Sequence, residues 1–166
     1  MAPKVFFSFN YDKDNARVSQ IRNIGAVEGQ TIVNDNEWEK VWKGGDQAVY
    51  NWIDTQLKDR TCTVVLIGAE TAGRKFINYE IEQSFKAGKG VFGVHIHNLK
   101  DLNQNTVSKG KNPFDDLKYL GIDDKNHPMS EYLKVYDPPF TDSKQVYKHI
   151  ADNLVKWIDA AIAQRK

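Results

Sequence analysis

Short runs rich in β-branched and aromatic residues alternate along this chain with stretches of helical periodicity. The clearest runs are residues 64–67 and 91–96, and residues 4–9, 31–33 and 133–136 form shorter ones. Runs without polar alternation are typical of strands that are buried on both faces of a parallel sheet. The pattern therefore predicts right-handed crossovers and an α/β fold, in which an open sheet carries helices on both faces.

Apolar residues at helical spacing mark the segments between these runs. We expect a weakly amphipathic helix over residues 12–22, a second with Asp46 as its N-cap, and a third that ends at Gly88. The helix near residues 143–164 is the clearest, because its apolar residues form one continuous stripe. Its capping candidates are Thr141, Asp142 and Ser143.

Five predicted strands suggest a flavodoxin-like sheet with the order 2-1-3-4-5. A length of 166 residues suits one domain, which we expect to span residues 1–166. The stretch near residues 98–128 interrupts the alternation of predicted strands and helices, because it is polar and contains several glycines and prolines. A loop this long in a compact domain is usually functional or mobile.

Composition narrows the classes of function. The formal net charge is +1, so the overall electrostatic potential does not favour binding to nucleic acid or to an anionic membrane. We expect neither as a partner. The single cysteine, Cys62, lies in an apolar run and is expected to be a small buried hydrophobe. We see no signal peptide and no apolar run of about 18 residues, which makes the cytoplasm the expected compartment.

A ligand site is expected beyond the carboxyl ends of the first and third strands, where the strand order reverses. The first strand runs out at Ser8 and Phe9, and the helix after the third strand places Glu80 about one turn in, close to the crevice. Phe76 lies four residues before Glu80 and shares its helix face. From spacing alone, a solvated helix residue is the stronger interpretation of Glu80, and a functional acid is the alternative.

Other chemistries fit this crevice poorly. A phosphate-binding loop needs glycines clustered before a helix, and Gly68 and Gly73 are too few and wrongly placed. A phosphoacceptor domain needs an aspartate at the end of the third strand, where this chain has Gly68. His95 and His97 face the same side of a strand without a visible third ligand, so we predict no metal site.

Several segments resemble one known family. Residues 5–9 (VFFSF) look like the opening strand of TIR domains and of the TIR-like family that includes the Thoeris antiphage B component. Residues 76–81 (FINYEI) resemble the segment in which an aromatic residue, usually Trp, precedes the catalytic glutamate by four positions. Further resemblance lies in residues 37–39, 64–68, 89–96 and 109–115. The resemblance covers residues 4 to about 120.

The resemblance implies cleavage of NAD⁺ to ADP-ribose or to a cyclic ADP-ribose isomer, an immune signal that activates a separate effector. NAD⁺ is then a substrate, and no cofactor or metal is expected. Glu80 takes the catalytic role, because a cationic nicotinamide leaving group needs no general acid and one carboxylate can stabilise the oxocarbenium-like ribose. The candidates for substrate binding are Ser8, Phe9, Asn34, Trp38 and Phe76.

Two alternatives remain open at this point. A non-catalytic TIR-like scaffold would act through protein–protein assembly, using the long polar loop and the last helix as surfaces. A phosphorelay or nucleotide-binding domain could share the same architecture, since fold alone does not select a function. The enzyme hypothesis adds self-association, a phage-derived trigger and a downstream effector as expected partners.

Overall fold

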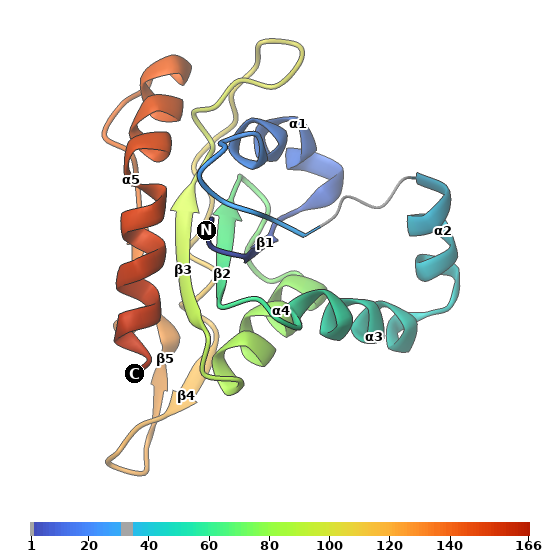
Figure 1. Cartoon of the computed structure of the whole chain (residues 1–166), viewed down its shortest axis with the longest axis vertical. Helices are drawn as coiled ribbons and strands as arrows, with labels where there is room; N and C mark the ends of the chain where they lie inside the picture. Colours follow the sequence, from blue (N-terminus) through green and yellow to red (C-terminus); the bar gives the residue numbers. More distant parts are fainter. Residues whose placement is uncertain (1, 31–34) are drawn as a thin grey trace.

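The computed structural model of the chain describes residues 2–30 and 35–166, with side chains in the second range from residue 39 onward (Figure 1). In this part of the chain the main sheet is parallel and has the order β1 (Val5–Ser8), β2 (Cys62–Ile67), β3 (Gly90–His95) and β6 (Val135–Tyr136). These are the predicted first, third, fourth and fifth strands. The predicted second strand, residues 31–33, lies outside the described residues.

The α/β prediction is confirmed by helices that cover both faces of the sheet. Alternate residues of β2 and β3, such as Val64 and Phe92, belong to a core shared with α1 (Tyr11–Arg22) and α5 (Ser143–Gln164). The intervening residues, such as Val65 and Val91, pack instead toward α4 (Lys75–Lys86). Because every residue of β2 and β3 is buried, each strand appears in the sequence as a continuous apolar run.

The helix ends follow ordinary capping chemistry. The Asp142 side chain accepts a hydrogen bond of 3.0 Å from Gln145 N, so Asp142 is the N-cap of α5 among its three candidates. Helix α3 (Asp46–Leu57) has its N-cap at Gly45, one residue before the predicted cap and without a side-chain cap; Gly45 adopts a φ of 85°, which glycine tolerates. Helix α2 (Asp35–Lys43) was not predicted. None of the described helices has the length and apolar character needed to cross a membrane.

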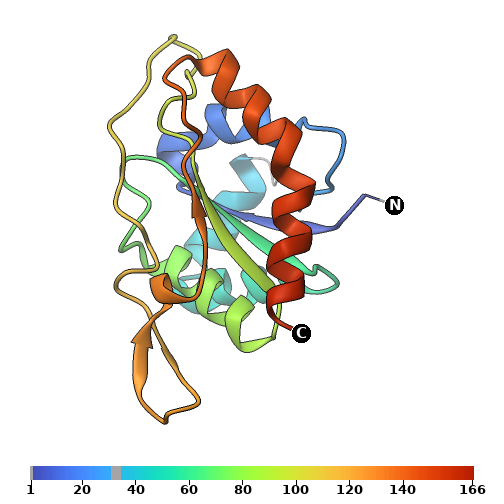
Figure 2. The same cartoon turned by 90° about the vertical axis from the view of Figure 1, so that its left-hand side faces the viewer.

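The polar stretch over residues 98–128 contains a small antiparallel hairpin. Strands β4 (Lys118–Leu120) and β5 (Asn126–Pro128) extend away from the main body and lead into a single 3-10 turn, η1 (Met129–Glu131) (Figure 2). Phe114, fully buried, anchors the stretch in the core on the α4 side. The stretch is therefore attached to the domain before the hairpin begins.

The outer edge of β1 is paired with residues 28–30. Val5 N donates to Glu28 O at 2.8 Å. Phe7 N donates to Gln30 Oε1 at 2.9 Å, and Gln30 Nε2 donates to Phe7 O at 2.8 Å. One side-chain amide thus satisfies both backbone groups of Phe7.

Candidate active site

Glu80 and Ser8 meet at the carboxyl end of β1. Ser8 is the last residue of β1, and its side chain points toward the face covered by α4. Its Oγ donates a hydrogen bond of 2.6 Å to Glu80 Oε1. Ser8 is fully buried and Glu80 is 8% exposed. The fold therefore joins two predicted site residues that are 72 positions apart in the sequence.

Burial dominates the electrostatics of Glu80. Loss of hydration raises the pKa of Glu80 from 4.5 to about 8, and the hydrogen bond from Ser8 opposes this rise without cancelling it. The carboxyl group therefore holds its proton at neutral pH in the free protein. A cation placed beside it would favour the ionised form, so the site is suited to a positively charged ligand. A strongly shifted carboxyl group beside a strand end is also typical of a functional site.

A second set of buried hydrogen bonds fixes α4 one turn beyond Glu80. Ser84 Oγ donates to the Glu80 carbonyl oxygen at 2.7 Å and lies 2.7 Å from Thr63 Oγ1 on β2. Thr63 and Ser84 are fully buried. Because buried polar pairs are costly to break, these contacts hold the helix segment that presents the Glu80 carboxylate.

The carboxyl end of β2 is closed by close packing. A Cβ atom on Gly68 would overlap the carboxylate of Asp14, and a Cβ atom on Gly110 would overlap the carbonyl oxygen of Gly68. Gly68 N also donates to Thr71 Oγ1 at 2.8 Å. Helix α1 and the loop around residue 110 therefore fill the position that a phosphoacceptor aspartate would need, which agrees with the prediction against a phosphorelay domain.

The structure does not gather all the predicted binding residues around Glu80. Phe9 points to the other face of the sheet, where it packs beside the α1 and α5 core, with its ring centroid 6.1 Å from that of Tyr11. Asn34 lies outside the described residues. Trp38 belongs to α2, and its side chain is outside the described part of the chain.

Phe76 lies on α4 one turn before Glu80 and belongs to an aromatic cluster. Its ring centroid is 5.6 Å from those of both Trp42 and Tyr50, in edge-on geometry. Helices α2, α3 and α4 therefore meet around this ring. Its predicted role in stacking on a substrate stays a prediction.

His95 and His97 lie buried where β3 ends. Their ring centroids are 5.6 Å apart, and burial lowers the pKa of His95 to about 4. Across residues 2–30 and 35–166, no group of three or more histidine, cysteine or acidic side chains is arranged to hold a metal ion. Burial thus keeps His95 neutral at pH 7.

Sequence reasoning missed a buried ion pair on α1. Arg17 Nη1 lies 3.2 Å from Asp14 Oδ1, and both side chains are 2% exposed. Arg17 also donates to the carbonyl oxygens of Leu99 and Asn105, at 2.8 and 2.9 Å. Arg17 therefore ties α1 to the loop after β3. The spacing of three residues on a helix was the available signal.

Comparison with known proteins places this architecture in a family. The family model for the TIR-like domain of Thoeris protein ThsB matches residues 6–101. The chain belongs to this family. It is also 38% identical over 124 residues to a Bacillus cereus (strain MSX-D12) protein named "Putative cyclic ADP-D-ribose synthase ThsB1".

That alignment covers 72% of this chain and 65% of the relative, so the chain spans about two thirds of the relative's length. The predicted resemblance to the TIR-like family is thus confirmed. Ser8 and Glu80 both lie inside the matched TIR-like segment.

Proposed function

We propose that this protein cleaves the bond between nicotinamide and ribose in NAD⁺, with Glu80 as the catalytic carboxylate. The observation that carries the proposal is the buried contact of 2.6 Å between Ser8 Oγ and Glu80 Oε1 at the end of β1. The name of the Bacillus relative, a cyclic ADP-D-ribose synthase, supports the same substrate class. Membership of the ThsB family supports a role in Thoeris antiphage defence.

A single carboxylate is sufficient for this reaction. Nicotinamide leaves from NAD⁺ as a neutral molecule and takes the bonding electron pair with it, so no acid has to protonate it. The positive charge then develops on the ribose, where an ionised Glu80 would stabilise it in a low-dielectric environment. Attack by a nucleophile within the ADP-ribose gives a cyclic isomer, attack by water gives linear ADP-ribose, and either route releases a proton.

The raised pKa of Glu80 fits this substrate. The free site holds a neutral carboxyl group, and the positive charge of the nicotinamide ring favours its ionisation when NAD⁺ binds. Ser8 would keep the ionised oxygen oriented through its hydrogen bond. We propose a cyclic product, which a separate effector would sense.

The proposal is tested by chromatography of NAD⁺ incubated with the purified protein, with and without lysate from infected cells. The lysate supplies a phage-derived trigger if one is needed. We expect nicotinamide and a cyclic ADP-ribose isomer from the parent protein, and neither from Glu80→Gln. Glu82→Gln is the matched control, because it changes the same residue type on the same helix two positions away.

Two results would reject this proposal. Turnover by Glu80→Gln at the parent rate would remove Glu80 from the catalytic role. Intact NAD⁺ under both conditions, even with the protein clustered, would favour the non-catalytic scaffold.

A further inference from the structure

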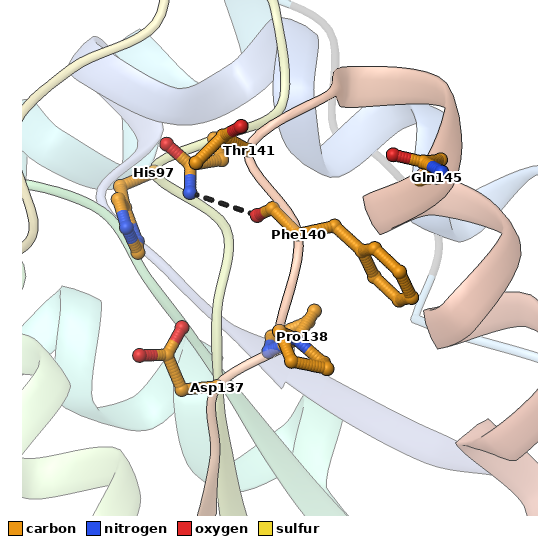
Figure 3. A pocket seen from close by; sticks show the side chains of 8 residues that line it. His97, Asp137, Pro138, Phe140, Thr141 and Gln145 are labelled. Atoms are coloured by element: carbon orange, nitrogen blue, oxygen red, sulfur yellow. Dashed lines mark hydrogen bonds between the residues drawn. The ribbon is translucent and has the colours of Figure 1, made fainter.

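A pocket of about 460 Å³ lies where β3 and β6 end and α5 begins (Figure 3). Its lining comprises His97, Asn98, Asp137, Pro138, Pro139, Phe140, Thr141 and Gln145. Strands β1 and β6 are at opposite edges of the described sheet, separated by three strand spacings, or about 14 Å. The pocket is therefore separate from the Ser8 and Glu80 site.

A hydrogen bond, an ion pair and a ring contact hold the pocket walls in place. Asn98 Nδ2 donates to the Phe140 carbonyl oxygen at 3.1 Å, which joins the segment after β3 to the segment before α5 (Figure 3). Lys109 Nζ lies 2.8 Å from Asp137 Oδ2. The Phe140 ring packs edge-on to His149 of α5, with 5.7 Å between ring centroids. The pocket is thus largely formed before any ligand arrives, as is usual for small-molecule sites.

The polar lining has unused hydrogen-bonding capacity. His97 is 9% exposed, and its Nδ1 has no hydrogen-bond partner in the described structure. Buried polar atoms in this state are uncommon in proteins, and each calls for a partner. Although partial burial acts in the other direction, the Lys109 ammonium group holds the pKa of Asp137 below its usual value. Asp137 is therefore an ionised acceptor at the pocket.

The lining also indicates the class of ligand. Phe140 and the adjacent prolines offer an apolar surface against which a planar ring can stack. The Asp137 carboxylate accepts hydrogen bonds from hydroxyl or amino groups and repels anions, since Lys109 is already paired with it. Thr141 and Gln145 can donate or accept. An uncharged compound with a planar ring and neighbouring hydroxyl groups satisfies all of these contacts.

We propose that this pocket is a second ligand site that binds a nucleoside, with the base against Phe140 and the ribose hydroxyls donating to Asp137. The volume lies within the range of about 300–1,000 Å³ that small-molecule sites occupy. The proposal does not depend on NAD⁺ cleavage at Glu80, because the two sites share none of their described residues.

The first test is calorimetric titration of the whole protein with adenosine. We expect Phe140→Ala to weaken binding at least about fivefold, as loss of a base-stacking side chain does. Tyr147→Ala is the matched control, because Tyr147 and Phe140 are both 36% exposed and Tyr147 is not part of the pocket lining. The control should bind adenosine like the parent.

The second test separates the ribose contact from the ion pair. Asp137→Ala and Lys109→Ala both break the 2.8 Å pair, but only the first removes the acceptor carboxylate. We expect Asp137→Ala to weaken adenosine binding at least about tenfold and to leave the affinity for adenine unchanged. Lys109→Ala should weaken adenosine binding less than Asp137→Ala does, because it loosens the pocket wall but keeps the acceptor carboxylate.

Three outcomes would overturn the proposal. One is the absence of adenosine binding by the parent at millimolar concentration. Another is an equal loss of adenosine affinity in Asp137→Ala and Lys109→Ala, which would mean that a shift of the loop, and not the missing carboxylate, weakens binding. The third is binding that survives Phe140→Ala but disappears in Glu80→Gln, which would place adenosine at the other site.

Discussion

At the scale of single residues, the burial of Glu80 predicts how stability depends on pH. The carboxyl group titrates near pH 4.5 when unfolded and near pH 8 when folded. Between these values the folded state binds more protons, so the free energy of unfolding decreases as pH rises. The stabilising contribution is complete below about pH 4.5 and is lost as pH passes about 8.

We therefore expect Glu80→Gln to become more stable relative to the parent as pH rises from about 5 to about 8.5. Gln cannot ionise, so the variant lacks this loss of stability. Calorimetric melting of both proteins across that range measures the difference in Tm. A difference that stays constant with pH would show that Glu80 titrates at its ordinary value.

Ser8 supports the charged form of Glu80, and its removal should reduce the NAD⁺ cleavage that we propose. A hydrogen bond to a charged group contributes about 1.5–3 kcal/mol, so Ser8→Ala should lower kcat/KM roughly 10- to 100-fold at pH 7. Without this bond the pKa of Glu80 rises further, and part of the loss should recover above about pH 9. A pH profile with the parent's midpoint would contradict a role that acts through Glu80.

The sequence was informative about which residues reach the site and uninformative about their contacts. Strand ends and helix spacing predicted that Ser8 and Glu80 would both lie near the crevice. Their direct hydrogen bond depends on how α4 docks against β1, and no local pattern encodes that docking. Phe9 is a different case: it directly follows Ser8, and alternation along an extended segment, which the sequence does show, sends its side chain to the opposite face.

At the scale of elements, the close approach of α5 to β3 makes Gly90 sensitive to substitution. A Cβ atom there would lie 2.8 Å from Ile162 N and 2.9 Å from the Ala161 carbonyl carbon, both backbone atoms of α5. We expect Gly90→Ala to destabilise the protein by about 1–3 kcal/mol, because the helix must shift.

Gly25→Ala is the matched control for this prediction. A Cβ atom at Gly25 would have no atom within 4 Å, and the substitution should change stability by less than about 1 kcal/mol. Chemical denaturation of the two variants and the parent gives both values. Equal effects of the two substitutions would mean that α5 yields to the extra methyl group.

Elements were predicted well where their residues are buried and poorly where they are not. The strands β2 and β3 are buried along their whole length, and the stripe of α5 faces the core, so their patterns are strong. Strands β4 and β5 have exposed or half-buried residues and carry no apolar run. Strands of three residues each, joined through residues 121–125, leave almost no periodic signal in the sequence.

At the scale of the whole molecule, Arg17 pairs with Asp14 within α1 and links that helix to the loop after β3. Arg17→Met would leave the Asp14 carboxylate buried without its partner, which typically costs about 3–5 kcal/mol. We expect that loss of stability in chemical denaturation, together with faster hydrogen exchange over residues 99–105.

Lys13→Met, on the same helix, is the matched control for Arg17→Met. Lys13 pairs with Glu70 at 3.9 Å, and both side chains are more than half exposed, at 58% and 57%. Surface pairs of this kind contribute about 0–1 kcal/mol, so this variant should resemble the parent. A loss in Lys13→Met as large as in Arg17→Met would contradict the importance of burial.

The pocket beside β6 could not be predicted from the sequence. It is formed by residues 97–98 together with residues 137–145, which are some 40 positions apart. Neither segment has a recognisable motif, and the pocket exists because parallel strands end at the same edge of the sheet.

The amide of Gln30 has a further consequence for behaviour at high concentration. An edge strand with unpaired N–H and C=O groups is a template on which other chains can polymerise. Gln30 occupies both groups of Phe7 within the same chain, so that position cannot recruit a foreign strand. One side chain thus closes the Phe7 position on the outer edge of β1 to pairing with another chain.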